Sequence, residues 1–86
     1  MIREKIKETF MEVLNQVEKK LLVSDLSDDV VLLESGLDSL GFAILIAALE
    51  EKLGYDPFTM LEEPVYPKTF GEFVSIYEKM NPNKLW

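Results

Sequence analysis

The chain has 86 residues, 48% of them hydrophobic, which fits one small domain with a single core. It contains no cysteine and no histidine, so we expect no disulfide, no metal centre and no self-contained enzyme. A formal net charge of −7 disfavours nucleic acid and favours partners with basic surfaces.

The first predicted element is a long amphipathic helix at the start of the chain. Apolar residues recur there at steps of three and four, with charged residues mostly between them. They are Ile2, Ile6, Phe10, Val13, Leu14, Val17 and Leu21.

A long connection follows, SDLSDDVVLLESGLD, in which Ser and Asp favour turns while the apolar residues can pin the loop to a core. Its acidic residues invite comparison with a calcium-binding EF-hand loop beginning at Asp25. The sixth position would then be Val30 instead of glycine, and the twelfth Gly36 instead of glutamate. We therefore reject calcium binding there.

The second predicted helix begins near Asp38 or Ser39, either of which can cap it, and ends at Gly54. It has two apolar faces. A core-facing stripe contains Phe42, Leu45, Ile46, Leu49 and Leu53. A second set, which we expect to form a docking surface beside Glu50 and Glu51, contains Leu40, Ala43, Ile44 and Ala47. The alternative is that this second set completes a tightly packed core.

The last part of the chain predicts one short and one longer helix. Prolines at 57, 64 and 67 leave room only for a short helix over 58–63. The final helix opens with Thr69 and Glu72 in a capping box, and Pro82 helps to end it. Its apolar stripe is Phe70, Phe73, Val74, Tyr77 and Met80. The chain as a whole predicts an all-α bundle of three main helices plus a short helix, with a long first loop.

The serine at the start of the second helix is the strongest candidate functional residue. Ser39 stands at a helix N-terminus, where unpaired N–H groups and the helix dipole favour an attached phosphate. It is a poor nucleophile on its own, because no histidine and no nearby lysine can activate it.

The motif GLDSL (36–40), followed by an apolar helix that ends EE-x-LG (50–54), resembles the phosphopantetheine attachment site of acyl carrier proteins and peptidyl carrier domains. The order of a long helix, a long loop, a serine-opened helix, a short helix and a final helix is also similar, so the resemblance covers nearly the whole chain.

The resemblance implies that Ser39 carries a covalent 4'-phosphopantetheine arm, which holds acyl or aminoacyl cargo as a thioester. A phosphopantetheinyl transferase, using coenzyme A and magnesium, would attach the arm. Asp38 would orient the transferase complex and Leu40 would enter its apolar pocket. Residues matching those that surround a sequestered acyl chain are Phe42, Leu45, Ile46 and Leu49.

The chain departs from fatty-acid carriers at the second and fifth positions after the serine, where those proteins have acidic residues. Here the positions are Gly41 and Ile44, which indicates a specialised lipid or polyketide-type pathway with its own loading ligase or synthase. Two alternatives stay open. One is an aminoacyl or peptidyl carrier, and the other a helical protein-interaction module without phosphopantetheine.

The longest apolar run, residues 42–49, is too short to span a bilayer, and the start of the chain lacks the apolar core of a signal peptide. We therefore expect a cytoplasmic monomer. Residues 1–86 would form one carrier domain, with a C-terminal tail over about 81–86, and we assign no role to Trp86.

Overall fold

The apolar periodicities of the sequence become helices in the computed structural model, which describes residues 2–61 and 67–81. In chain order the elements are α1 (Ile2–Gln16), a 3-10 turn η1 (Leu32–Glu34), α2 (Ser39–Leu53), α3 (Pro57–Met60) and α4 (Phe70–Lys79). Across the described ranges the β-type pairing consists of one isolated bridge, between Val31 and Thr69. The predicted fold class is confirmed.

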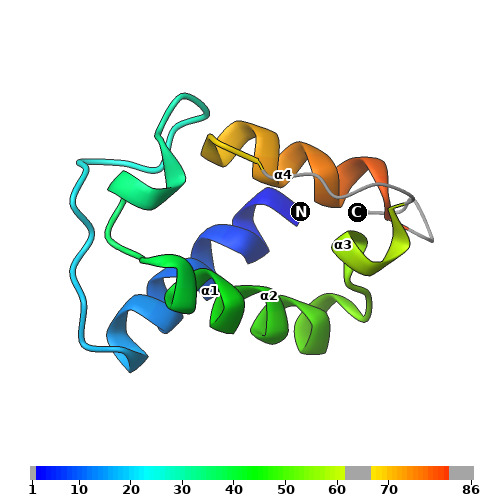
Figure 1. Ribbon diagram of the computed structural model, residues 1–86, viewed down its shortest axis with the longest axis horizontal. Coiled ribbons are helices and arrows are strands. Elements are labelled where there is room, and N and C mark those ends of the chain that lie inside the picture. The colour runs from blue at the N-terminus through cyan, green and yellow to red at the C-terminus, as the bar shows by residue number, and fades with distance from the viewer. Residues whose placement is uncertain (1, 62–66, 82–86) are drawn as a thin grey trace.

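Helix α1 is the centre of the bundle and packs against both α2 and α4. In Figure 1, α2 and α4 run in the same direction across the picture, while α1 runs behind and between them in the opposite direction. The core lies among these helices. Its fully buried side chains include Phe10, Leu45, Leu49, Phe70 and Tyr77.

Helix α1 ends earlier than its apolar pattern predicts. The pattern continues to Leu21, but the helix stops at Gln16 because Glu18 adopts a left-handed backbone with φ of 58°. The N–H of Glu18 donates to the carbonyl of Asn15 at 3.2 Å, and the N–H of Lys19 donates to the carbonyl of Leu14 at 2.8 Å. These two bonds form a Schellman ending. Val17 and Leu21 still pack against the core from outside the helix.

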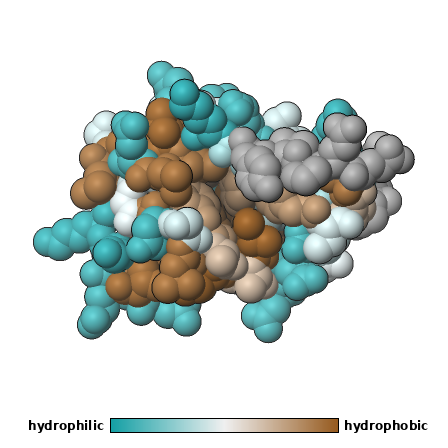
Figure 2. All heavy atoms as spheres, viewed as in Figure 1, coloured by the Kyte–Doolittle hydropathy of each residue, from teal (hydrophilic) through white to brown (hydrophobic). Residues whose placement is uncertain are grey.

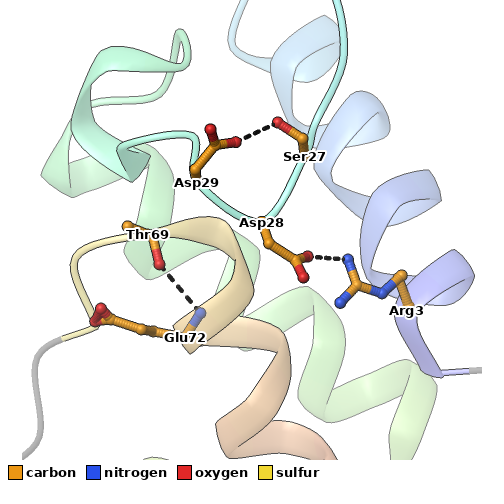
Figure 3. A network of polar contacts seen from close by, with 6 residues as sticks. All are labelled: Arg3, Ser27, Asp28, Asp29, Thr69 and Glu72. Carbon is orange, nitrogen blue, oxygen red and sulfur yellow. Dashed lines mark hydrogen bonds and ion pairs between the residues drawn. The ribbon is translucent and has the colours of Figure 1, made fainter.

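The long first loop is attached to the start of α4 by backbone hydrogen bonds. The N–H of Leu32 donates to the backbone carbonyl of Lys68 at 2.9 Å. In return, the N–H groups of Phe70 and Gly71 donate to the backbone carbonyls of Val30 and Asp28. A Cβ on Gly71 would lie 2.8 Å from that of Asp28, so glycine permits this close approach. Figure 3 shows the same junction, where Asp28 also pairs with Arg3 of α1.

The ends of α2 agree with the prediction. Asp38 is the N-cap, and Gly54, with φ of 84°, is the left-handed C-cap whose N–H donates to the carbonyl of Glu50.

The short helix α3 spans Pro57–Met60 instead of the predicted 58–63, because Asp56 caps it one residue earlier and Pro57 occupies its first turn. Residues 62 and 63 of that prediction lie outside the described residues, as does the tail beyond Asn81.

Helix α4 begins with half of the predicted capping box. The hydroxyl of Thr69 accepts the N–H of Glu72 at 3.2 Å, as the box requires (Figure 3). The carboxylate of Glu72 instead accepts the N–H of Lys68 at 3.2 Å. Of the predicted stripe, Met80 is half-buried and the other four residues are buried.

Candidate functional site

Ser39 is the first residue of α2 and its side chain is exposed. The N–H groups of Ser39 and Leu40 belong to the first helical turn, where the backbone ladder offers no acceptor. The site therefore combines an accessible hydroxyl with free donors and the positive end of the helix dipole. This combination suits a phosphoester.

The turn before Ser39 is held by close packing. Gly36 has φ of 126°, and a Cβ at this position would lie only 2.4 Å from the carbonyl oxygen of Lys20. The N–H of Leu22 donates to the carbonyl of Ser35 at 3.0 Å, which joins the two ends of the loop. Leu37, next in the chain, is buried in the core. Ser39 thus stands on a turn whose backbone is well supported.

Asp38 links this turn to the helix. Its carboxylate accepts the N–H of Gly41 at 2.8 Å, and its carbonyl accepts the N–H of Phe42 at 3.0 Å. Gly41 is buried, and a Cβ there would lie 2.8 Å from Cδ2 of Leu37. The glycine found where fatty-acid carriers have an acidic residue therefore has a structural reason in this chain.

The other serines of the first sixty residues occupy different environments. Ser35 is buried and donates to the carbonyl of Leu32. Ser27 is exposed and donates to the carboxylate of Asp29 at 2.7 Å, which lowers the pKa of that carboxyl group. Ser24 is exposed in the long loop. Among these serines, Ser39 is the one that opens a helix.

The residues expected to surround an acyl chain divide by burial. Leu45 and Leu49 are buried, whereas Phe42 and Ile46 are half-buried. Phe42 makes edge contacts with Phe10 of α1 and Phe73 of α4, each with ring centroids 6.0 Å apart. The inward face of α2 thus contacts both other long helices.

The residues expected to dock partners lie on the outer side of α2 with one exception. Those exposed are Leu40, Ala43, Ala47, Glu50 and Glu51, and Leu40 is 70% exposed. Ile44 is half-buried and packs against the core. Figure 2 shows hydrophobic side chains over α2 and over the loop that precedes it. An apolar surface therefore adjoins the serine.

The sequence analysis did not identify a row of aromatic rings that begins near this site. From Phe42 the row continues to Phe73 and then to Tyr77. The ring centroids of Phe73 and Tyr77 are 5.1 Å apart. Tyr55 and Phe58 flank its far end. Burial, followed by the charge of Asp56, raises the pKa of Tyr77 well above that of an ordinary phenol. The spacing of Phe73 and Tyr77 in the sequence predicts that both side chains are buried. It does not predict that the hydroxyl of Tyr77 lacks a hydrogen-bond partner among the described residues.

No helix in the described ranges is both long and apolar enough to cross a membrane.

The family model described as "Phosphopantetheine attachment site" matches residues 4–60, which is more than half of the chain and includes the whole of α2. Neither the curated proteins nor the solved structures returned a match.

Proposed function

We propose, because the chain belongs to the phosphopantetheine attachment site family, that it is an acyl carrier protein in which Ser39 bears the 4'-phosphopantetheine. This family attaches phosphopantetheine covalently to a serine. The proposed function is transport of acyl intermediates between partner enzymes, with no catalysis by the chain itself.

The observation that carries this proposal is the position of Ser39 at the start of α2 with an exposed side chain. The residues present fit the group. The N–H groups of Ser39 and Leu40 can receive a phosphate, whereas the N–H of Gly41 already donates to the Asp38 carboxylate at 2.8 Å. The bound group supplies the thiol on which acyl cargo is held as a thioester.

The chain's own contribution is presentation. The packed turn at Gly36 and Leu37 holds Ser39 at the surface, so a transferase can reach its hydroxyl. We propose that Leu40, which is largely exposed, enters an apolar pocket of that transferase, and that Asp38 orients the complex. Holding cargo on the protein raises its local concentration at each partner's active site.

The docking surface that we propose is α2 with its exposed residues Leu40, Ala43 and Ala47, bordered by Glu50 and Glu51. The two carboxylates and the net charge of −7 would steer partners with basic surfaces. Ile44 contributes its exposed part, since the rest packs on the core.

We further propose service in a specialised lipid or polyketide-type pathway. The support is that neither position carries a charge, since Gly41 is buried against Leu37 and Ile44 is a half-buried apolar residue. An enzyme that recognises acidic residues at these two positions would find none. An aminoacyl cargo is the competing outcome, and loading tests distinguish the two.

The test is the intact mass of the purified protein after incubation with coenzyme A and a broad-specificity phosphopantetheinyl transferase. We expect one phosphopantetheine on the parent and none on Ser39→Ala. Ser24→Ala is the matched control, because Ser24 is also exposed and lies in the matched region. Ser24→Ala should load like the parent. Loading that survives Ser39→Ala would refute the assignment.

Cargo is then assigned by offering the loaded carrier to candidate ligases. Acylation by fatty-acyl or polyketide ligases supports the proposal, and acylation only by amino-acid-activating enzymes would replace it with an aminoacyl carrier.

A further inference from the structure

Two neighbouring tyrosines have opposite hydrogen-bonding states. Tyr55, between α2 and α3, and Tyr77 of α4 are both buried, with ring centroids 6.0 Å apart. The hydroxyl of Tyr55 donates to the backbone carbonyl of Tyr77 at 2.6 Å. The hydroxyl of Tyr77 is buried and has no hydrogen-bond partner among the described residues.

An unused hydroxyl in an apolar core is unfavourable, because it has lost its hydrogen bonds to water without replacement. Tyr77 is 0% exposed, so solvent at the surface does not reach it. A phenylalanine would fill the same space without this penalty. The hydroxyl therefore has an unused capacity to donate to an atom that enters the core.

A row of ring contacts leads from Phe42, in the first turns of the same helix as Ser39, to the ring that bears this hydroxyl. Phe42 lies three residues after Ser39, its ring contacts that of Phe73, and Phe73 contacts Tyr77. Phe58 of α3 stacks on Phe73 at 6.0 Å and 27°. Phe42 and Phe58 are half-buried, so the row is accessible from the surface at these two rings.

The arrangement of the helices allows insertion along this row. Helix α1 packs closely against α2 and α4, whereas α2 and α4 are bridged by the Phe42 and Phe73 rings. Ring contacts can shift by rotation of side chains, and closely packed backbones cannot. An acyl chain attached through Ser39 can therefore lie between α2 and α4.

The charges around Tyr77 favour a neutral acceptor over an anionic one. Burial, and then the carboxylate of Asp56, raise the pKa of Tyr77, which keeps the hydroxyl protonated and able to donate. Glu50 acts in the same direction. The same two carboxylates repel an anionic acceptor, so a carboxylate on the cargo is disfavoured.

We propose that Tyr77 selects oxygenated cargo, by donating a hydrogen bond to a neutral keto or hydroxyl oxygen on an acyl chain that lies along the rings of Phe42 and Phe73. This inference rests on the proposed function, because it requires an acyl group attached through Ser39. It makes Tyr77 a specificity-determining residue and names the class of cargo.

The test uses the full chain loaded with different acyl groups by a phosphopantetheinyl transferase and the corresponding acyl-coenzyme A compounds. The cargoes are straight saturated chains, the same chains with one keto oxygen at successive carbons, and chains that end in a carboxylate. Three proteins are compared: the parent, Tyr77→Phe, and Tyr55→Phe as the matched control. Intact mass verifies loading, and Tm is then measured for each.

On the parent, a keto oxygen at one or two positions should raise Tm by roughly 4–8 °C over the saturated chain, the shift expected for one hydrogen bond in so small a domain. Tyr55→Phe should retain this difference and Tyr77→Phe should lose it. The terminal carboxylate should give no rise. Equal Tm for keto and saturated chains at every position would overturn the inference, as would a difference that persists in Tyr77→Phe.

The infrared stretching band of an isotopically labelled keto group gives a second readout. It should lie at lower frequency on the parent than on Tyr77→Phe, because a hydrogen bond weakens the carbonyl bond. Identical frequencies would refute the contact. Failure of the parent to load at all would remove the proposed function, whereas loading without discrimination would remove only this inference.

Discussion

The carboxylate of Asp38 takes the N–H of Gly41, and the adjacent Ser39 is left exposed. A carboxylate in this position caps the helix and complements its dipole. The same residue is proposed to orient the transferase. Its structural and recognition roles can be separated because asparagine caps nearly as well as aspartate but carries no charge.

Asp38→Ala should lower the free energy of unfolding by about 1 kcal/mol, as is usual on loss of an N-cap, and should also slow loading of Ser39. Asp38→Asn should keep most of the stability and still load slowly. Denaturant unfolding and the initial rate of phosphopantetheine transfer measure the two effects. If Asp38→Asn loads at the parent rate, Asp38 serves only as a cap.

At the scale of the element, α2 places one leucine in the core and another in solvent. Leu49 is 0% exposed and Leu40 is 70% exposed, although both belong to the same helix. The difference arises because residues nine positions apart lie on different sides of an α-helix, at about 3.6 residues per turn. The two leucines therefore form a matched pair for separating stability from recognition.

Leu49→Ala should destabilise the fold by about 2–4 kcal/mol, because it leaves a cavity among buried residues. Leu40→Ala should change stability by less than about 0.5 kcal/mol. Loading should show the reverse order, with Leu40→Ala slower than the parent. Thermal or denaturant unfolding, together with transfer rates, measures both. A large loss of stability in Leu40→Ala would contradict the assignment of faces.

Across the whole molecule, the aromatic core makes stability depend on alkaline pH. The unfolded chain ionises a tyrosine near its ordinary pKa of 10.0, whereas burial and then Asp56 raise the pKa of Tyr77 in the folded state. The folded state therefore keeps a proton that the unfolded state releases. The contribution of Tyr77 is fully present below about pH 10 and is lost as pH rises further.

Tyr77→Phe should accordingly move the alkaline unfolding transition to higher pH, since phenylalanine has no proton to lose. It should also raise Tm of the unloaded protein at neutral pH, because the unpaired hydroxyl is removed. Circular dichroism across a pH titration checks the first result and a thermal melt checks the second. Tyr55→Phe, which loses a hydrogen bond of 2.6 Å, should lower Tm instead. An unchanged alkaline transition in Tyr77→Phe would show that other groups control it.

Much of the bundle followed from the sequence alone because its signals are local. The bounds of α2, from a cap at Asp38 or Ser39 to Gly54, depend on residues within one turn of each end. The start of α4 at Thr69 is of the same kind. The GLDSL motif and the order of the helices were likewise sufficient to identify the family.

Tertiary structure decided what depends on residues distant in the chain. The loop that leaves α1 after Gln16 must cover the core and pair with α4, so the helix ends before the apolar pattern does. The burial of Phe42 depends on rings from two other helices, so the spacing within α2 does not determine it. The hydroxyl of Tyr77 is likewise unpaired among the described residues because of which residues from other parts of the chain pack around it. Hydrophobic spacing predicts that a side chain is buried, but only the packed neighbours determine whether its polar atom finds a partner.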